Sequence, residues 1–103
     1  MGSKERRFEI ELSTGVWIDV RHARDPEKEM DWAAVLTVKR CGRRRAVYLY
    51  DNAHGRPERH RYRRGVKMEA EALSPKSSAR FDLPAAVEEI KAKWEGMVKR
   101  WEP

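Results

Sequence analysis

The sequence predicts a single α+β domain: an antiparallel meander of four or five strands, with one C-terminal amphipathic helix packed on one face. Two observations support this fold class. Apolar residues alternate with polar ones along the first part of the chain, and near its end they recur at intervals of three and four. The chain has 103 residues, the length of one domain, so residues 1–103 are expected to form one unit.

A β-hairpin is predicted near the N-terminus. Residues 8–12 alternate apolar and acidic side chains, and residues 16–20 resume the same period of two. Between these segments lie Ser13, Thr14 and Gly15, a combination typical of a turn. The stretch 25–29, which begins Asp-Pro and continues with charged residues, predicts a loop after the hairpin.

Two further strands are predicted in the middle of the chain. Residues 32–38 (WAAVLTV) and 46–51 (AVYLYD) are apolar on both faces until Asp51, as expected of central strands. Cys41 lies between them, next to a glycine, and is expected to be a turn residue. Residues 61–73 alternate more weakly, with Met68, Ala70 and Ala72 on one face, and predict a fifth strand broken near Gly65.

The last quarter of the chain predicts a loop and then a helix. Residues 74–80 (SPKSSAR) have the composition of a loop, and Asp82 is a suitable N-cap before a proline in the first turn. An apolar stripe at helical spacing follows, which should cover one face of the sheet and leave its last residue as an alternative dimer contact. The stripe consists of Leu83, Val87, Ile90, Trp94, Met97 and Trp101.

Charge is distributed unevenly along the chain. The whole sequence has 23 Lys and Arg against 17 Asp and Glu, but residues 39–67 alone hold 11 basic residues against Asp51 and Glu58. Such a basic centre attracts RNA or another phosphate polyanion, or an acidic protein partner. A single cysteine and the lack of an apolar segment of about 20 residues favour a cytoplasmic protein with no membrane partner.

The stretch YDNAHGRPERHRY, residues 50–62, holds two of the chain's three histidines and two of its three tyrosines. In an extended segment His60 and Tyr62 share one face, while the arginines at 59, 61 and 63 share the other at about 6.5 to 7 Å spacing. That spacing approximates the repeat of nucleic-acid phosphates, and aromatic rings stack on unpaired bases. The predicted nucleic-acid contacts are Arg43, Arg44, Arg45, Arg56, Arg59, Tyr62 and Arg63.

Acid–base chemistry is a second prediction for this stretch. Because histidine titrates near pH ~6.5, His60 and His54 could exchange protons with a phosphodiester, with Asp51 orienting a ring and Arg61 stabilising the phosphoryl charge. This chemistry predicts a ribonuclease that requires no metal and no cofactor. Asp51, His54 and His60 match no familiar zinc-ligand spacing, so no metal site is predicted.

In the same stretch the sequence resembles small bacterial proteins related to the TumE-like toxin components of toxin–antitoxin loci. The resemblance extends in outline to the preceding strand and to the C-terminal helix. It implies functional roles for Asp51, Asn52, Gly55, Arg59 and His60, and a cognate antitoxin as partner. The family has a denser His-Arg-His run, whereas here Glu58 and Arg59 precede His60.

Three interpretations therefore follow from the sequence. The first is a toxin-like protein that binds, and in its enzymatic form cleaves, RNA through residues 51–62. The second is a non-enzymatic module that binds an acidic protein, such as an antitoxin, or a second copy of itself. In the third, the Asp, Asn, Gly and Pro of the stretch only shape a hairpin between two strands.

Overall fold

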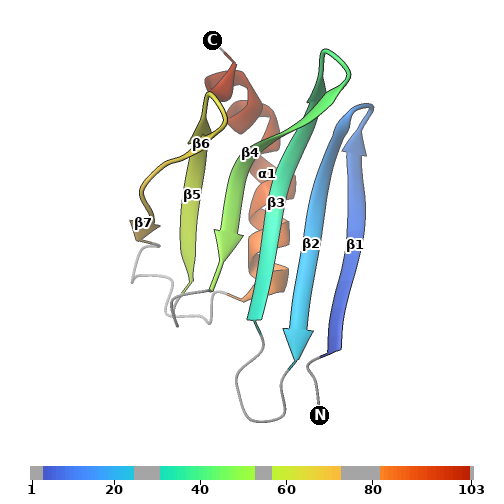
Figure 1. Ribbon diagram of the computed structural model, residues 1–103, viewed down its shortest axis with the longest axis vertical. Coiled ribbons are helices and arrows are strands. Elements are labelled where there is room, and N and C mark those ends of the chain that lie inside the picture. Colours follow the sequence, from blue (N-terminus) through green and yellow to red (C-terminus); the bar gives the residue numbers. More distant parts are fainter. Residues whose placement is uncertain (1–3, 25–30, 53–56, 73–81, 103) are drawn as a thin grey trace.

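The computed structural model describes residues 4–24, 31–52, 57–72 and 82–102, which form seven strands and one helix (Figure 1). The loops expected at 25–29 and 74–80 lie outside the described residues. The elements are β1 (Lys4–Ser13), β2 (Val16–Arg24), β3 (Asp31–Arg40), β4 (Arg43–Asp51), β5 (Glu58–Arg63), β6 (Val66–Lys67), β7 (Glu71–Ala72) and α1 (Leu83–Trp101).

The strands form one antiparallel meander in the order β1-β2-β3-β4-β5-β6, with β7 also pairing with β5. The predicted α+β fold class and its antiparallel meander are confirmed. The strand expected at 61–73 is wrong in detail, because the chain reverses at Arg64 and Gly65 and returns along β5 as two short pieces. Met68 lies between these pieces and is 43% exposed, so it does not belong to a buried strand face.

Two-residue turns close the hairpins at Cys41-Gly42 and at Arg64-Gly65. Both residues of each turn have positive φ: 53° and 75° in the first turn, 52° and 78° in the second. This is the type I′ geometry, whose twist matches that of the flanking strands. Cys41 is therefore a turn residue, as expected, and it is exposed.

Helix α1 covers one face of the sheet, against β3 and β4 (Figure 1). Its N-cap is Asp82, whose carboxylate accepts a hydrogen bond from the Ala85 amide at 3.1 Å, as expected. The predicted stripe lies on the sheet, although the buried residues also include Ala86 and Val98, while Val87, Trp94 and Trp101 are half-buried at its margin. Burial of a side chain such as Ile90 contributes about 1.5 to 3 kcal/mol to the free energy of unfolding.

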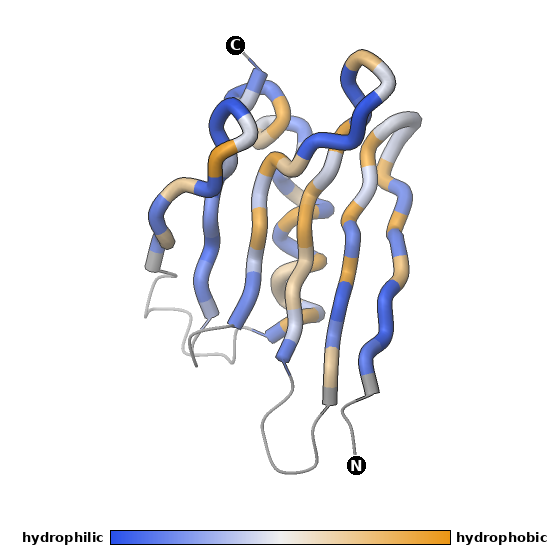
Figure 2. The backbone as a smooth tube through the Cα atoms, in the orientation of Figure 1, coloured by the Kyte–Doolittle hydropathy of each residue, from blue (hydrophilic) through white to orange (hydrophobic). Residues whose placement is uncertain are grey.

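The strand register assigns each side chain to the helix-covered face or to the opposite face. Leu36 of β3, Tyr48 of β4 and Arg61 of β5 are register partners on the helix-covered face. Leu49 and His60 are partners on the opposite face, because successive residues of a strand point to opposite sides. Figure 2 shows that β3 and the middle of β4 are apolar, whereas β5 is polar. No helix in the described parts of the chain has the length and apolar character needed to cross a bilayer.

Candidate nucleic-acid interface

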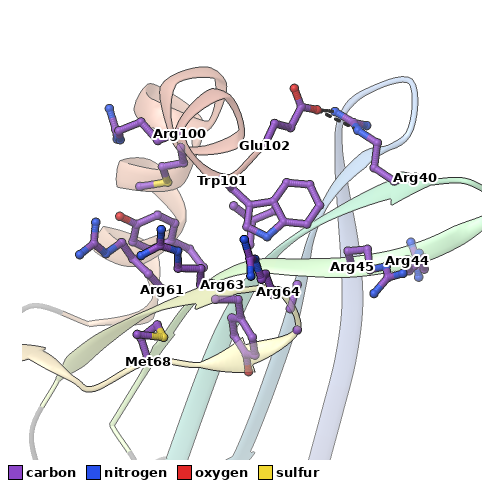
Figure 3. Close-up of a pocket in the computed structure, with 16 residues that line it drawn as sticks. Arg40, Arg44, Arg45, Arg61, Arg63, Arg64, Met68, Arg100, Trp101 and Glu102 are labelled. Carbon is purple, nitrogen blue, oxygen red and sulfur yellow. Dashed lines mark hydrogen bonds and ion pairs between the residues drawn. The ribbon is translucent and has the colours of Figure 1, made fainter.

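A basic groove lies where the C-terminal end of α1 meets β4, β5 and the β5–β6 turn (Figure 3). Its cavity volume is about 1040 Å³. Three aromatic residues, Tyr48, Tyr62 and Trp101, contribute to its walls together with Met68 and Met97. We call this surface the arginine groove after the seven arginines that line it: Arg40, Arg44, Arg45, Arg61, Arg63, Arg64 and Arg100.

Each wall of the groove has a local structural cause. Arg45 is the register partner of the buried Val38, which puts it on the helix-covered face. Arg61 and Arg63 reach the same face by the alternation along β5, and Arg64 follows in the type I′ turn. Arg100 lies in the last turn of α1, where a cation interacts favourably with the negative end of the helix dipole.

The charge of the groove is only partly neutralised by neighbouring carboxylates. Arg40 pairs with Glu102, the one acidic residue of the lining, and Arg61 Nε lies 2.9 Å from Glu71 Oε1. Within residues 4–24, 31–52, 57–72 and 82–102, no ion pair to a carboxylate is made by the remaining arginines on this face. These residues, which we call the free arginines, are Arg45, Arg63, Arg64 and Arg100.

Arg44 differs from the other lining arginines because its guanidinium is directed to the opposite face. It lies 4.1 Å from the centre of the Trp17 ring and pairs with Glu9 at 2.5 Å. The hydrogen bond from Arg44 lowers the pKa of Glu9 below its ordinary value, and the same bond raises the pKa of Arg44. Arg44 therefore contributes to the rim of the groove, and its charge is already paired.

Arg59, a predicted nucleic-acid contact, belongs to a network between the sheet and the helix. Its Nη2 lies 2.9 Å from Glu71 Oε2, and its Nη1 lies 3.8 Å from Glu89 Oε2. Burial raises the pKa of the neighbouring Tyr50, and interaction with Glu89 raises it further. Burial acts to raise the pKa of Glu89 as well, but hydrogen bonds from Tyr50 and Lys93 outweigh it and the pKa is lowered. Arg59 does not line the arginine groove.

The predicted catalytic residues are only partly brought together. His60 is buried on the opposite face, near Asp51, whereas Arg61 lines the groove on the helix-covered face. A single phosphate cannot contact both His60 and Arg61 in this arrangement. His54, like the predicted contact Arg56, lies outside the described residues.

The remaining predicted contacts are placed as follows. Arg45, Arg63 and Tyr62 all line the groove. Arg43 is exposed near the start of β4 but is not part of the lining.

Several lining residues were not predicted from the sequence. The groove forms because α1 ends above β4 and the β5–β6 turn. The lining residues that depend on this docking are Arg40, Arg64, Arg100, Tyr48 and Trp101. The sequence held one usable signal, since Arg100 and Trp101 are a cation and an aromatic ring at the end of the predicted stripe. Glu58, whose sequence position indicated no functional role, is the register partner of Asp51 across the β4–β5 hairpin.

Comparison with known proteins identifies a family without assigning an activity. No curated protein and no solved structure matches the chain. The resemblance to toxin components therefore stays a prediction. One family model matches residues 1–103, and its description is "Domain of unknown function (DUF7718)". The chain belongs to the DUF7718 family over its whole length.

Proposed function

We propose that the protein binds single-stranded RNA along the arginine groove. The observation that carries the proposal is the set of four free arginines on one concave surface, with Arg40 and Arg61 beside them. Guanidinium groups bind phosphate oxygens through paired hydrogen bonds, and each phosphate neutralised releases counterions. The arginines thus supply affinity for a backbone rather than for a particular base.

The aromatic residues of the groove favour a single-stranded ligand. Trp101 is half-buried, so its ring is held by the fold while part of its surface stays accessible, whereas alternation along β5 directs the Tyr62 ring to the opposite face. Bases of a single strand can stack on such rings, each stack contributing about 1 to 3 kcal/mol, whereas bases in a duplex are already stacked on one another. Figure 3 shows Trp101 close to Arg63 and Arg64 in this view of the groove.

The proposal is for binding and not for cleavage. The acid–base mechanism requires His60 and Arg61 at one phosphate, and alternation along β5 separates them by the thickness of the sheet. A toxin-like role rests on the sequence resemblance and is compatible with RNA binding. An acidic antitoxin would compete with RNA for the same arginines.

The test is fluorescence anisotropy with a labelled single-stranded RNA at low salt. A triple variant, Arg45→Gln, Arg63→Gln and Arg64→Gln, should lose at least tenfold in affinity, because each substitution removes a phosphate contact. Single-stranded DNA and duplex RNA of the same length are measured alongside, and weaker binding of both supports single-stranded RNA as the ligand. Poly-L-glutamate as competitor tests the acidic-protein alternative.

A control of equal charge separates the groove from the overall positive charge. Arg6, Lys91 and Lys93 are exposed and lie outside the groove, so their triple change to Gln should alter RNA affinity less than threefold. Equal losses of RNA affinity in the two triple variants would show that the overall positive charge of the protein, and not the groove, accounts for binding. Displacement of RNA by poly-L-glutamate at equal charge concentration would favour the acidic protein partner instead.

A further inference from the structure

A second polar cluster lies on the face of the sheet opposite to α1. Asp51 of β4 and Glu58 of β5 are direct register partners, and His60 follows two residues later on the same face. All three are buried, with exposed fractions of 9%, 6% and 6%. One carboxylate oxygen from each acid and one ring nitrogen of His60 lie within 4.8 Å of one another.

A backbone contact determines which His60 nitrogen faces the carboxylates. His60 Nδ1 lies 3.0 Å from the carbonyl oxygen of Met68. Because a carbonyl can only accept a hydrogen bond, Nδ1 carries the proton of this bond. In the neutral ring Nε2 then has its lone pair directed at Glu58, whose Oε2 lies 3.6 Å away, too far for a normal hydrogen bond.

This arrangement has the features of a metal-ligand set. A histidine that binds metal usually donates its other ring N–H to a carbonyl or carboxylate, which fixes the ring and its tautomer. Around a tetrahedral ion with bonds of about 2.0 to 2.2 Å, neighbouring ligand atoms lie roughly 3.3 to 3.6 Å apart. The 3.6 Å separation between Nε2 and Glu58 Oε2 fits that spacing. The lone pairs of His60 Nε2 and Glu58 Oε2 face each other and repel, and a cation bound between the two atoms would remove that repulsion.

We propose that Asp51, Glu58 and His60 bind one divalent transition-metal ion, with Zn²⁺ or Mn²⁺ as the matching ions. An imidazole nitrogen with two carboxylate oxygens suits these ions, whereas Mg²⁺ and Ca²⁺ prefer oxygen ligands alone. The site joins β4 to β5 on the face away from the arginine groove, so it does not depend on RNA binding.

The test is metal binding to the full chain after treatment with a chelator, measured by calorimetry and by the thermal midpoint. Zn²⁺ or Mn²⁺ should bind with one equivalent and raise the midpoint, and Mg²⁺ and Ca²⁺ should bind at least tenfold more weakly. Glu58→Gln, which keeps the side-chain volume, and His60→Ala should each reduce affinity at least tenfold. His22→Ala, a half-buried histidine on β2 outside the cluster, should leave affinity unchanged.

Nitrogen-15 spectra of the wild-type histidine rings provide a readout that does not depend on whether the variants fold. On metal addition the His60 Nε2 resonance should shift while Nδ1 stays protonated. The proposal would be overturned if the wild type bound neither Zn²⁺ nor Mn²⁺. Binding that persists in both Glu58→Gln and His60→Ala, or a His60 Nε2 resonance that does not change when metal is added, would also overturn it.

Discussion

His60 and Arg61 are consecutive residues of β5, yet their side chains lie on opposite faces of the sheet. Arg61 lines the arginine groove beside α1, while His60 is buried against Glu58 and the Met68 carbonyl. A stretch that looks like one reactive loop in the sequence therefore contributes to two separate surfaces. One surface is a candidate for phosphate binding and the other for metal binding.

The aromatic wall of the groove gives a prediction about RNA affinity. Trp101→Leu should weaken binding of single-stranded RNA by about tenfold, since base stacking on a ring contributes about 1 to 3 kcal/mol. Trp94→Leu is the matched control, because Trp94 is also half-buried on α1 but does not line the groove. Anisotropy at constant salt measures both variants. Equal losses for the two would show that stability, not stacking, accounts for the effect.

Tyr50 gives a prediction about alkaline stability. Its side chain is fully buried and its pKa is raised, so above pH ~10 the unfolded tyrosine loses its proton while the folded one keeps it. The native state then binds more protons, and the free energy of unfolding falls as pH rises. Relative to Tyr50→Phe, the wild type should lose up to about 1.4 kcal/mol per pH unit above 10.

Urea unfolding of the wild type and Tyr50→Phe at pH 8, 10 and 11 measures this difference. Other titrating groups are common to both proteins, so their contributions cancel in the comparison. Parallel curves across the three pH values would mean that Tyr50 ionises as readily in the folded state as in the unfolded chain.

Two glycines should respond to alanine in opposite directions. Gly42 has φ of 75° in a type I′ turn, with no neighbouring atom within 4 Å of an added Cβ, so Gly42→Ala should cost about 1 to 2 kcal/mol through backbone strain alone. Gly96 lies inside α1, where alanine is favoured by about 0.8 to 1 kcal/mol. An added Cβ there would be 3.3 Å from the mobile end of the Arg100 side chain, which can move aside. Thermal unfolding of both variants should give shifts of opposite sign.

Local patterns were sufficient to predict most of the fold. The first hairpin and α1 each bury a face whose period of two or 3.6 is visible in the chain, and β3 and β4 are visible as continuous apolar runs. The pieces after Gly65 were misread because β6 and β7 depend on pairing with β5 rather than on a buried face of their own. Such short edge strands leave little hydrophobic signal.

The two candidate sites were predictable only in part, since both depend on contacts between distant segments. The charge of residues 39–67 indicated Arg45 and Arg63, but Arg100 and Trp101 enter the groove by helix docking. Likewise, Glu58 meets Asp51 through strand register, which depends on the length of the connection between β4 and β5.

The salt dependence of RNA binding tests the central claim most directly. With about four phosphates neutralised by the free arginines, log K should fall against log salt with a slope of about −3, at roughly 0.7 per phosphate on a single strand. Arg63→Gln should reduce that slope by about 0.7, while Lys91→Gln should leave it unchanged. A slope near zero for the wild type, or equal slopes for Arg63→Gln and the wild type, would contradict RNA binding in the arginine groove.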